Sequence, residues 1–285
     1  MSATSGIRLK QCPPEGEGVN KWTFSTALVL YRLGWPADKI TSFLHEHTTR
    51  SGEEAESEIE RAAQNAPLWL KGQAGTSFRR WPATNASLVE KITSSGFRLD
   101  DLRDASPGEC TRAHEVLPLL FPGDPLIWVA SSLKPERGGT YRVHQLPFVA
   151  SLKQFIVPNP MTSCSSSAPG KSSRCLANTG PRRFLVIERD QGTLDEQAAI
   201  LWHLADFAPL ALVVHSAGKS LHGWFYVAER TEAQSRKFME FAVSLGADSA
   251  TWCKCQPVRM PGGHRSGAGI QNVLFFNPGA MEANR

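Results

Sequence analysis

The order of apolar segments between residues 182 and 276 constrains the fold of this chain most. Four short segments rich in β-branched and aromatic residues are expected to be strands, at 182–188, 210–216, 220–228 and 271–276. Two longer amphipathic segments, 193–207 with Thr193 as N-cap and 231–246, are expected to be helices. The order strand, helix, strand, strand, helix, strand predicts an α+β fold of the split β-α-β kind.

The N-terminal part has a different, helical pattern. Asn20 is a suitable N-cap for a helix that ends at Gly34, and Pro36 suits the first turn of a second helix over 37–50. A third helix is predicted over 53–66, with acidic residues in its first turn and an end before Pro67. We therefore expect a small helical domain within residues 1–80.

Residues 81–115 are less regular and are interpreted as a connector with one short helix at 86–96. A second domain is expected over residues 116–285. Besides the segments above, it contains possible strands at 125–131, 140–148 and 256–260, and a Ser-rich run at 163–175 that predicts a loop.

Composition excludes several classes of protein. The chain has 285 residues and a net charge of +4, which is compatible with a nucleic-acid partner but does not require one. No apolar run approaches the roughly 20 residues that span a bilayer, so no membrane association is expected. The first residues show no secretory signal pattern, and six Cys are too few for a disulfide scaffold. A cytoplasmic location with reduced thiols is the expectation.

The first chemical motif is F-L-V-I-E-R-D, in which an apolar strand ends in two carboxylates. Glu188 and Asp190 stand at i and i+2, which places them on one face if the strand continues. Neighbouring carboxylates repel each other, and a divalent cation on oxygen ligands removes that repulsion. The plainer alternative is a strand that ends in a solvated acidic loop.

The second motif is V-V-H-S-A-G-K-S-L-H-G-W. Val213 stands where a phosphate-binding P-loop needs Gly, and a strand follows instead of a helix, so a P-loop is excluded. A tight turn from Ser216 to Lys219 remains, and its backbone N–H groups can bind phosphate oxygens. Ser220 and His222 would share one face of the next strand.

The third motif follows the last predicted helix. Asp248 comes after the helix end, where a turn or cap residue is the simpler interpretation. Arg259 lies on a short predicted strand, and Arg265 follows the turn formed by Pro261, Gly262 and Gly263. Two guanidinium groups beside a glycine turn suit a triphosphate or a nucleic-acid backbone, and a solvated basic loop is the alternative.

Together the acidic pair, the Ser-x-His and the later Asp resemble the archaeo-eukaryotic primase (primase-polymerase) superfamily. The resemblance covers roughly residues 117–277 and implies an RRM-like catalytic core preceded by the small helical domain. It implies that Glu188, Asp190 and Asp248 hold Mg²⁺ or Mn²⁺, and that Ser220 and His222, with Lys219, bind the phosphates of the nucleotide. Ser216, Arg259 and Arg265 are assigned to the same nucleotide site from their positions in the motifs. Glu188 stands where many members of the family have Asp.

The resemblance implies a DNA-directed primase, a nucleotidyltransferase that makes replication primers on single-stranded DNA from NTPs or dNTPs, as in phages, plasmids and other mobile elements. No Walker motif is present, so a replicative helicase would be a separate chain or a missing C-terminal part. Two alternatives remain: a catalytically inactive, replication-initiator-like DNA-binding protein, and a nucleotide-binding regulator.

Three further groups were considered for function. Arg79, Arg80, Trp81 and Lys91 could contact a template, although a partly buried Trp in a connector is the favoured interpretation. Four cysteines could form a zinc site, but they lack the usual C-x₂-C spacing: Cys164, Cys175, Cys253 and Cys255. His45 and His47 form an H-x-H pair on a predicted helix, where i and i+2 do not share a face.

Overall fold

The computed structural model describes residues 11–14, 19–71, 81–108, 112–132, 138–165 and 172–282. The chain divides into two compact units, Met1–Arg80 and Trp81–Arg285. The hydrophobic clusters follow this division, because one lies within the first unit and the others within the second. Among the described residues, no helix is long and apolar enough to cross a membrane.

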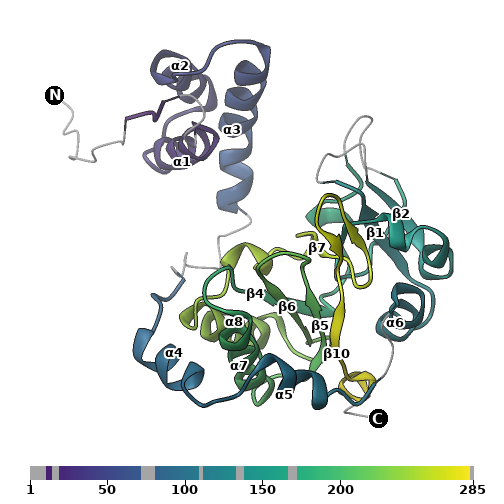
Figure 1. Ribbon diagram of the computed structural model, residues 1–285. Coiled ribbons are helices and arrows are strands. Elements are labelled where there is room, and N and C mark those ends of the chain that lie inside the picture. The colour runs from purple at the N-terminus through teal and green to yellow at the C-terminus, as the bar shows by residue number, and fades with distance from the viewer. Residues whose placement is uncertain are drawn as a thin grey trace. The chain divides into compact units, whose positions relative to one another are not determined.

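The first unit is the three-helix domain that the sequence predicts (Figure 1, purple end). Its helices are α1 (Val19–Arg32), α2 (Ala37–His47) and α3 (Glu53–Lys71). Leu30, Ile40 and Leu44 are fully buried between them. The predicted end before Pro67 is wrong, because α3 continues to Lys71. A proline ring removes one hydrogen bond of the helix, and the following turn can still form.

The second unit contains five α-helices among its described residues. They are α4 (Ala86–Thr93), α5 (Leu99–Asp104), α6 (Ala113–Leu120), α7 (Leu194–Ala205) and α8 (Glu232–Ser244). The predicted helices over 86–96, 193–207 and 231–246 are confirmed, and α5 and α6 were not predicted. Because α4 and α5 contact α7, much of the segment interpreted as a connector packs against the core of this unit.

The main sheet is antiparallel and has the strand order β10-β5-β6-β4. Its strands are β4 (Phe184–Glu188), β5 (Leu210–His215), β6 (Leu221–Tyr226) and β10 (Val273–Phe276), as the sequence predicts. β6 lies between β4 and β5, so the split β-α-β unit is present, and the α+β class is confirmed. A ferredoxin-like, RRM-like order would place the last strand beside the first, whereas β10 pairs with β5. The main sheet therefore departs from the RRM-like order at β10, and the predicted RRM-like core is not confirmed.

A second antiparallel sheet has the order β2-β1-β3-β7. It consists of β1 (Leu126–Ala130), β2 (Gly138–Arg142), β3 (Phe155–Ile156) and β7 (Val258–Arg259). The strand expected over 140–148 ends at Arg142, where the chain turns into a 3₁₀ helix, η2 (Val143–Phe148), that contains Pro147. A small hairpin of β8 (His264–Arg265) and β9 (Gly269–Ile270) follows β7.

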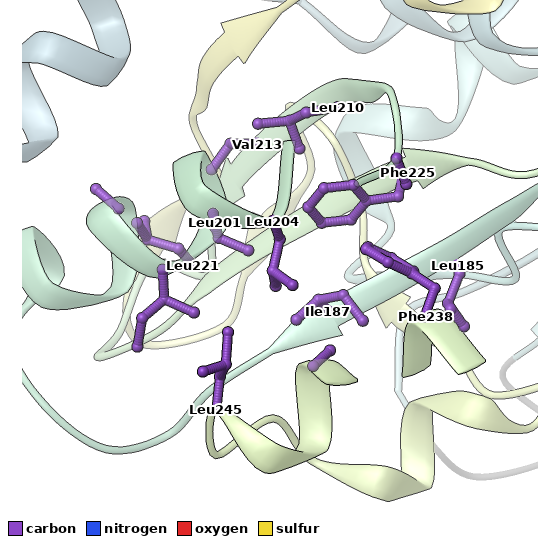
Figure 2. Packing of buried hydrophobic residues seen from close by; sticks show 14 of the residues in the cluster. Leu185, Ile187, Leu201, Leu204, Leu210, Val213, Leu221, Phe225, Phe238 and Leu245 are labelled. Carbon is purple, nitrogen blue, oxygen red and sulfur yellow. The ribbon is translucent and has the colours of Figure 1, made fainter. Parts of the chain in front are cut away.

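The two faces of the main sheet have different partners. Leu185, Ile187 and Phe225 pack against α7 and α8 (Figure 2). Phe184, Val186 and Trp224 belong to the cluster that contains residues of the second sheet, and Figure 1 shows that sheet on the side away from α7 and α8. Since side chains alternate along a strand, Glu188 and His222 follow these residues onto the face away from the helices.

Candidate functional site

The centre of the site is a cross-strand pair. Glu188, the last residue of β4, is paired in register with His222 on β6. Glu188 Oε1 lies 3.3 Å from His222 Nε2 and accepts a hydrogen bond of 3.3 Å from the Ser220 hydroxyl. Ser220 Oγ also lies 3.2 Å from Ser216 Oγ. The predicted Ser-x-His therefore converges on one carboxylate oxygen of the predicted acidic pair.

His222 is 2% exposed, and neither ring nitrogen has a hydrogen-bond partner among the described residues. The contact with Glu188 has the distance of an ion pair without the alignment of a hydrogen bond. Buried polar groups are rarely left without a partner in folded proteins, because their desolvation is not compensated. The imidazole thus has unused hydrogen-bonding capacity, and it shares Glu188 Oε1 with the Ser220 hydroxyl.

The electrostatics favour the ionised form of Glu188. Burial raises the pKa of this carboxyl, but the contacts with His222 and Ser220 and the charge of Arg259 outweigh burial and leave its pKa below the ordinary value. The side chain of Glu188 is 24% exposed. A partly buried carboxylate that stays charged is available to attract a cation or an imidazolium.

The Ser216–Lys219 turn stands beside this pair and is held by a side chain that the sequence analysis missed. Gln197 on α7 is buried; its Nε2 donates to Lys219 O at 3.0 Å and its Oε1 accepts from Leu221 N at 2.8 Å. Ala217 adopts a left-handed conformation with φ of 52°. A polar residue on an otherwise apolar helix stretch is the signal that could have identified Gln197.

One cation belongs to the turn, a second contacts it, and a third interacts electrostatically with the second. Arg265 Nη1 donates to Ser216 O at 3.4 Å, and Lys219 Nζ lies 3.7 Å from Asp190 Oδ1. Burial lowers the pKa of Arg259, the positive charge of Arg265 adds to this, and the charge of Glu188 opposes it. These mutual effects place Glu188, Arg259 and Arg265 in one electrostatic neighbourhood. Arg259 also stacks on Phe155, 4.7 Å from the ring centre.

The other two predicted acids lie at the same end of β4 but have separate partners. The expectation that Glu188 and Asp190 share a strand face is wrong, because β4 ends at Glu188 and Asp190 is exposed. Asp248 N donates to Glu188 O at 2.8 Å, which brings the two backbones together. The Asp248 carboxylate caps the 3₁₀ helix η5 (Ser249–Trp252) by accepting from Ala250 N at 2.9 Å.

The three acids fit a divalent cation in chemistry, since carboxylate oxygens are the ligands that Mg²⁺ and Mn²⁺ prefer. Their backbones are adjacent, but within the described ranges no three His, Cys, Asp or Glu side chains are arranged to hold a metal ion. The same finding covers the cysteines considered for zinc. Cys253 and Cys255 lie together, with 3.4 Å between their sulfur atoms.

The residues considered for a template or for an H-x-H site are not part of the contacts described above. Arg79 and Arg80 are outside the described residues. The Trp81 ring is covered by the Arg236 guanidinium at 3.5 Å and meets Trp252 edge-on, which supports a structural role. Lys91 is exposed on α4, and His45 and His47 are exposed on α2.

Comparison with known proteins gives no relative: no family model, no curated protein and no solved structure matches this chain. The geometry of the residues at the end of β4 and β6 is therefore the basis for assigning a function. That geometry combines a carboxylate, a buried imidazole in contact with it, two hydroxyls and a tight turn that a guanidinium group contacts.

Proposed function

We propose that the second unit is a metal-dependent nucleotidyltransferase that makes primers on single-stranded DNA, that is, a DNA primase or primase-polymerase. The observation that carries this proposal is the convergence of Ser220 and His222 on Glu188, next to the Ser216–Lys219 turn. A nucleotide-transfer site needs acidic groups and phosphate-binding groups side by side, and this arrangement supplies both.

The phosphates of an incoming nucleotide would be bound by donors around the turn. Neither ring nitrogen of His222 has a hydrogen-bond partner among the described residues, and its Nε2 shares Glu188 Oε1 with the Ser220 hydroxyl, which lies 3.2 Å from Ser216 Oγ. Lys219 is largely exposed and can leave Asp190 to follow a phosphate, while Arg265 already reaches the turn backbone. Arg259 adds a second guanidinium close to Glu188. These groups position the triphosphate and neutralise its charge.

Glu188, Asp190 and Asp248 would hold Mg²⁺ or Mn²⁺. A bound divalent ion supplies neutralisation of the charge that develops on the reacting phosphate. To hold the ion, Asp248 would give up its cap on Ala250 N, and Asp190 would give up its contact with Lys219. No protein nucleophile is needed, because the catalytic contribution of the side chains is positioning and charge compensation.

The substrates of the proposed enzyme are NTPs or dNTPs and a single-stranded DNA template. Replication in a phage, plasmid or other mobile element would place this activity beside a separate replicative helicase. The positive net charge of +4 agrees with a nucleic-acid partner.

The test is primer synthesis on single-stranded DNA with labelled NTPs or dNTPs and Mg²⁺ or Mn²⁺. Wild type is expected to make product, and Asp190→Ala is expected to abolish it while leaving the fold intact, because Asp190 is exposed. Asp206→Ala is the matched control. Asp206 is also an exposed carboxylate, but it follows the C-terminus of α7, whereas Asp190 precedes the N-terminus of that helix. Equal product from wild type and Asp190→Ala would contradict the proposal.

One observation favours a second candidate, a catalytically inactive initiator-like protein that binds DNA. The Asp248 carboxylate is engaged as a helix cap, and Glu188 is engaged by Ser220 and His222. If wild type binds single-stranded DNA but makes no product under any combination of metal and nucleotide, the second candidate replaces the first.

A further inference from the structure

A second chemical group, which the proposed function does not use, lies in the turn that follows η5. Cys253 and Cys255 flank Lys254, and Gln256 N donates to Cys253 O at 2.9 Å to close the turn. The two sulfur atoms are 3.4 Å apart, and both residues are partly exposed. A disulfide bond is about 2.05 Å long, so the two sulfur atoms have to approach each other by roughly 1.3 Å to form one.

The turn is fixed by contacts from three other segments. Asn159 Nδ2 donates to Lys254 O at 2.9 Å, and Lys254 Nζ donates to Gly180 O at 3.2 Å. Arg174 Nη1 donates to Cys255 O at 3.4 Å. These bonds hold the thiols next to each other before any reaction, which gives the second thiol a high effective concentration toward the first.

The surroundings of the pair also shift the pKa values of the two thiols in opposite directions. The hydrogen bond from Cys255 lowers the pKa of Cys253 against the effect of burial, and the charges of Arg182 and Arg174 add to the lowering. The same hydrogen bond, together with burial, raises the pKa of Cys255. One thiolate beside one thiol is the arrangement of an attacking and a resolving cysteine.

We propose that Cys253 and Cys255 are a redox-active dithiol that low-molecular-weight disulfides convert into an intramolecular disulfide. The Cys253 thiolate attacks one sulfur of the oxidant, which breaks its S–S bond and releases one thiolate. Cys255 then loses its proton to solvent and attacks Cys253 Sγ, which releases the second thiolate. The protein is oxidised by two electrons and the oxidant is reduced to two thiols. This proposal does not depend on the proposed function.

The experiment treats the full-length protein with oxidised glutathione under native conditions, followed by alkylation and mass spectrometry of the peptides. Wild type is expected to lose about 2 Da through a Cys253–Cys255 bond. Cys255→Ser should accumulate the mixed disulfide at Cys253, because the resolving thiol is gone. Cys253→Ser should react at least about tenfold more slowly. Cys164→Ser, which removes an exposed thiol, is the matched control and should behave as wild type.

The proposal is overturned if Cys253→Ser is oxidised as fast as wild type, or if wild type forms its disulfides through other cysteines. A second measurement uses wild type alone, so its result does not depend on whether the variants fold. The rate of iodoacetamide alkylation at Cys253 is measured as a function of pH, and it rises to a plateau as the thiol ionises. The pH at half of this plateau should be below about 8.5, the pKa of a free thiol. A half-plateau at or above that pH would also overturn the proposal.

Discussion

Glu188 connects the chemistry of the site to the pH dependence of stability. Its pKa in the folded chain is below the ordinary value of about 4.3, so the unfolded chain takes up a proton at a higher pH than the folded one. The contribution of this carboxylate to the free energy of unfolding is therefore fully present above the ordinary pKa of Glu. It is lost as the pH falls through the pKa that Glu188 has in the folded chain. We predict that Glu188→Gln lowers the free energy of unfolding by roughly 1–2 kcal/mol near neutral pH.

The difference between wild type and Glu188→Gln should shrink as the pH falls from about 5 to 3. Urea unfolding followed by circular dichroism at each pH measures it. Asp190→Asn is the control, because its carboxylate is exposed and its ion pair with the largely exposed Lys219 is 3.7 Å long. A difference that stays constant with pH would show that Glu188 does not have a lowered pKa.

Gly218 offers a way to move Arg265 without removing it. A Cβ at this position would overlap Arg265 Nη1, the end of a flexible side chain, so the fold can accommodate the methyl group by displacing the guanidinium. On the proposed function, we predict that Gly218→Ala weakens nucleotide binding about as much as Arg265→Ala, with little change in melting temperature. A fluorescent nucleotide titration measures both, and the double variant should lose no more than either single one. Additive losses would mean that Arg265 and the turn bind independently.

At the scale of elements, Gly223 sets how closely α7 approaches the sheet. A Cβ on Gly223 of β6 would lie 2.5 Å from Leu201 Cδ2, within the core shown in Figure 2. We predict that Gly223→Ala destabilises the second unit by about 1–3 kcal/mol, because overpacking shifts the helix or the strand. Adding Leu201→Ala should make room and recover part of the loss, which chemical denaturation can measure. Unchanged stability of Gly223→Ala would show that α7 is not held against β6 at this point.

The elements that carry the site could be predicted because their signals are local. The apolar runs of β4, β5 and β6 are bounded by turns, and Thr193 caps α7 by accepting from Glu196 N, as expected. In contrast, α5 has only six residues and α6 contains Pro118, so neither shows a helical period long enough to identify. The end predicted at Pro67 was wrong because a proline inside a helix removes one hydrogen bond without preventing the next turn, and α3 continues to Lys71.

The contacts within the site could be predicted only in part from local sequence patterns. The shared face of Ser220 and His222 follows from strand periodicity, but the register that sets Glu188 opposite His222 depends on the pairing of two distant strands. The support from Gln197 joins segments that are distant in the sequence and has no sequence motif, whereas the Asp248 cap on Ala250 N is local and agrees with the cap interpretation of the sequence. Side-chain period predicts which residues share a face, whereas the partner of each side chain is decided by the assembled sheet.

At the scale of the whole molecule, each unit has its own hydrophobic core. The cluster of the first unit includes Trp22, Leu30 and Ile59, and the clusters of the second contain no residue before Trp81. A core of this kind in a segment of about 200 residues is sufficient for independent folding. We predict that residues 81–285, expressed alone, unfold cooperatively with the midpoint that the second unit shows in the full chain.

The same fragment separates two parts of the proposed function. Every residue assigned to the nucleotide site, from Glu188 to Arg265, lies in the second unit, so the fragment should bind nucleotide as tightly as the full chain. Its affinity for single-stranded DNA, measured by fluorescence anisotropy at several salt concentrations, reports on the first unit. If log affinity depends less on log salt in the fragment than in the full chain, residues 1–80 contribute phosphate contacts. If the dependence is equal in both, all of the phosphate contacts belong to the second unit. Loss of nucleotide binding in a folded fragment would contradict the placement of the whole site in the second unit.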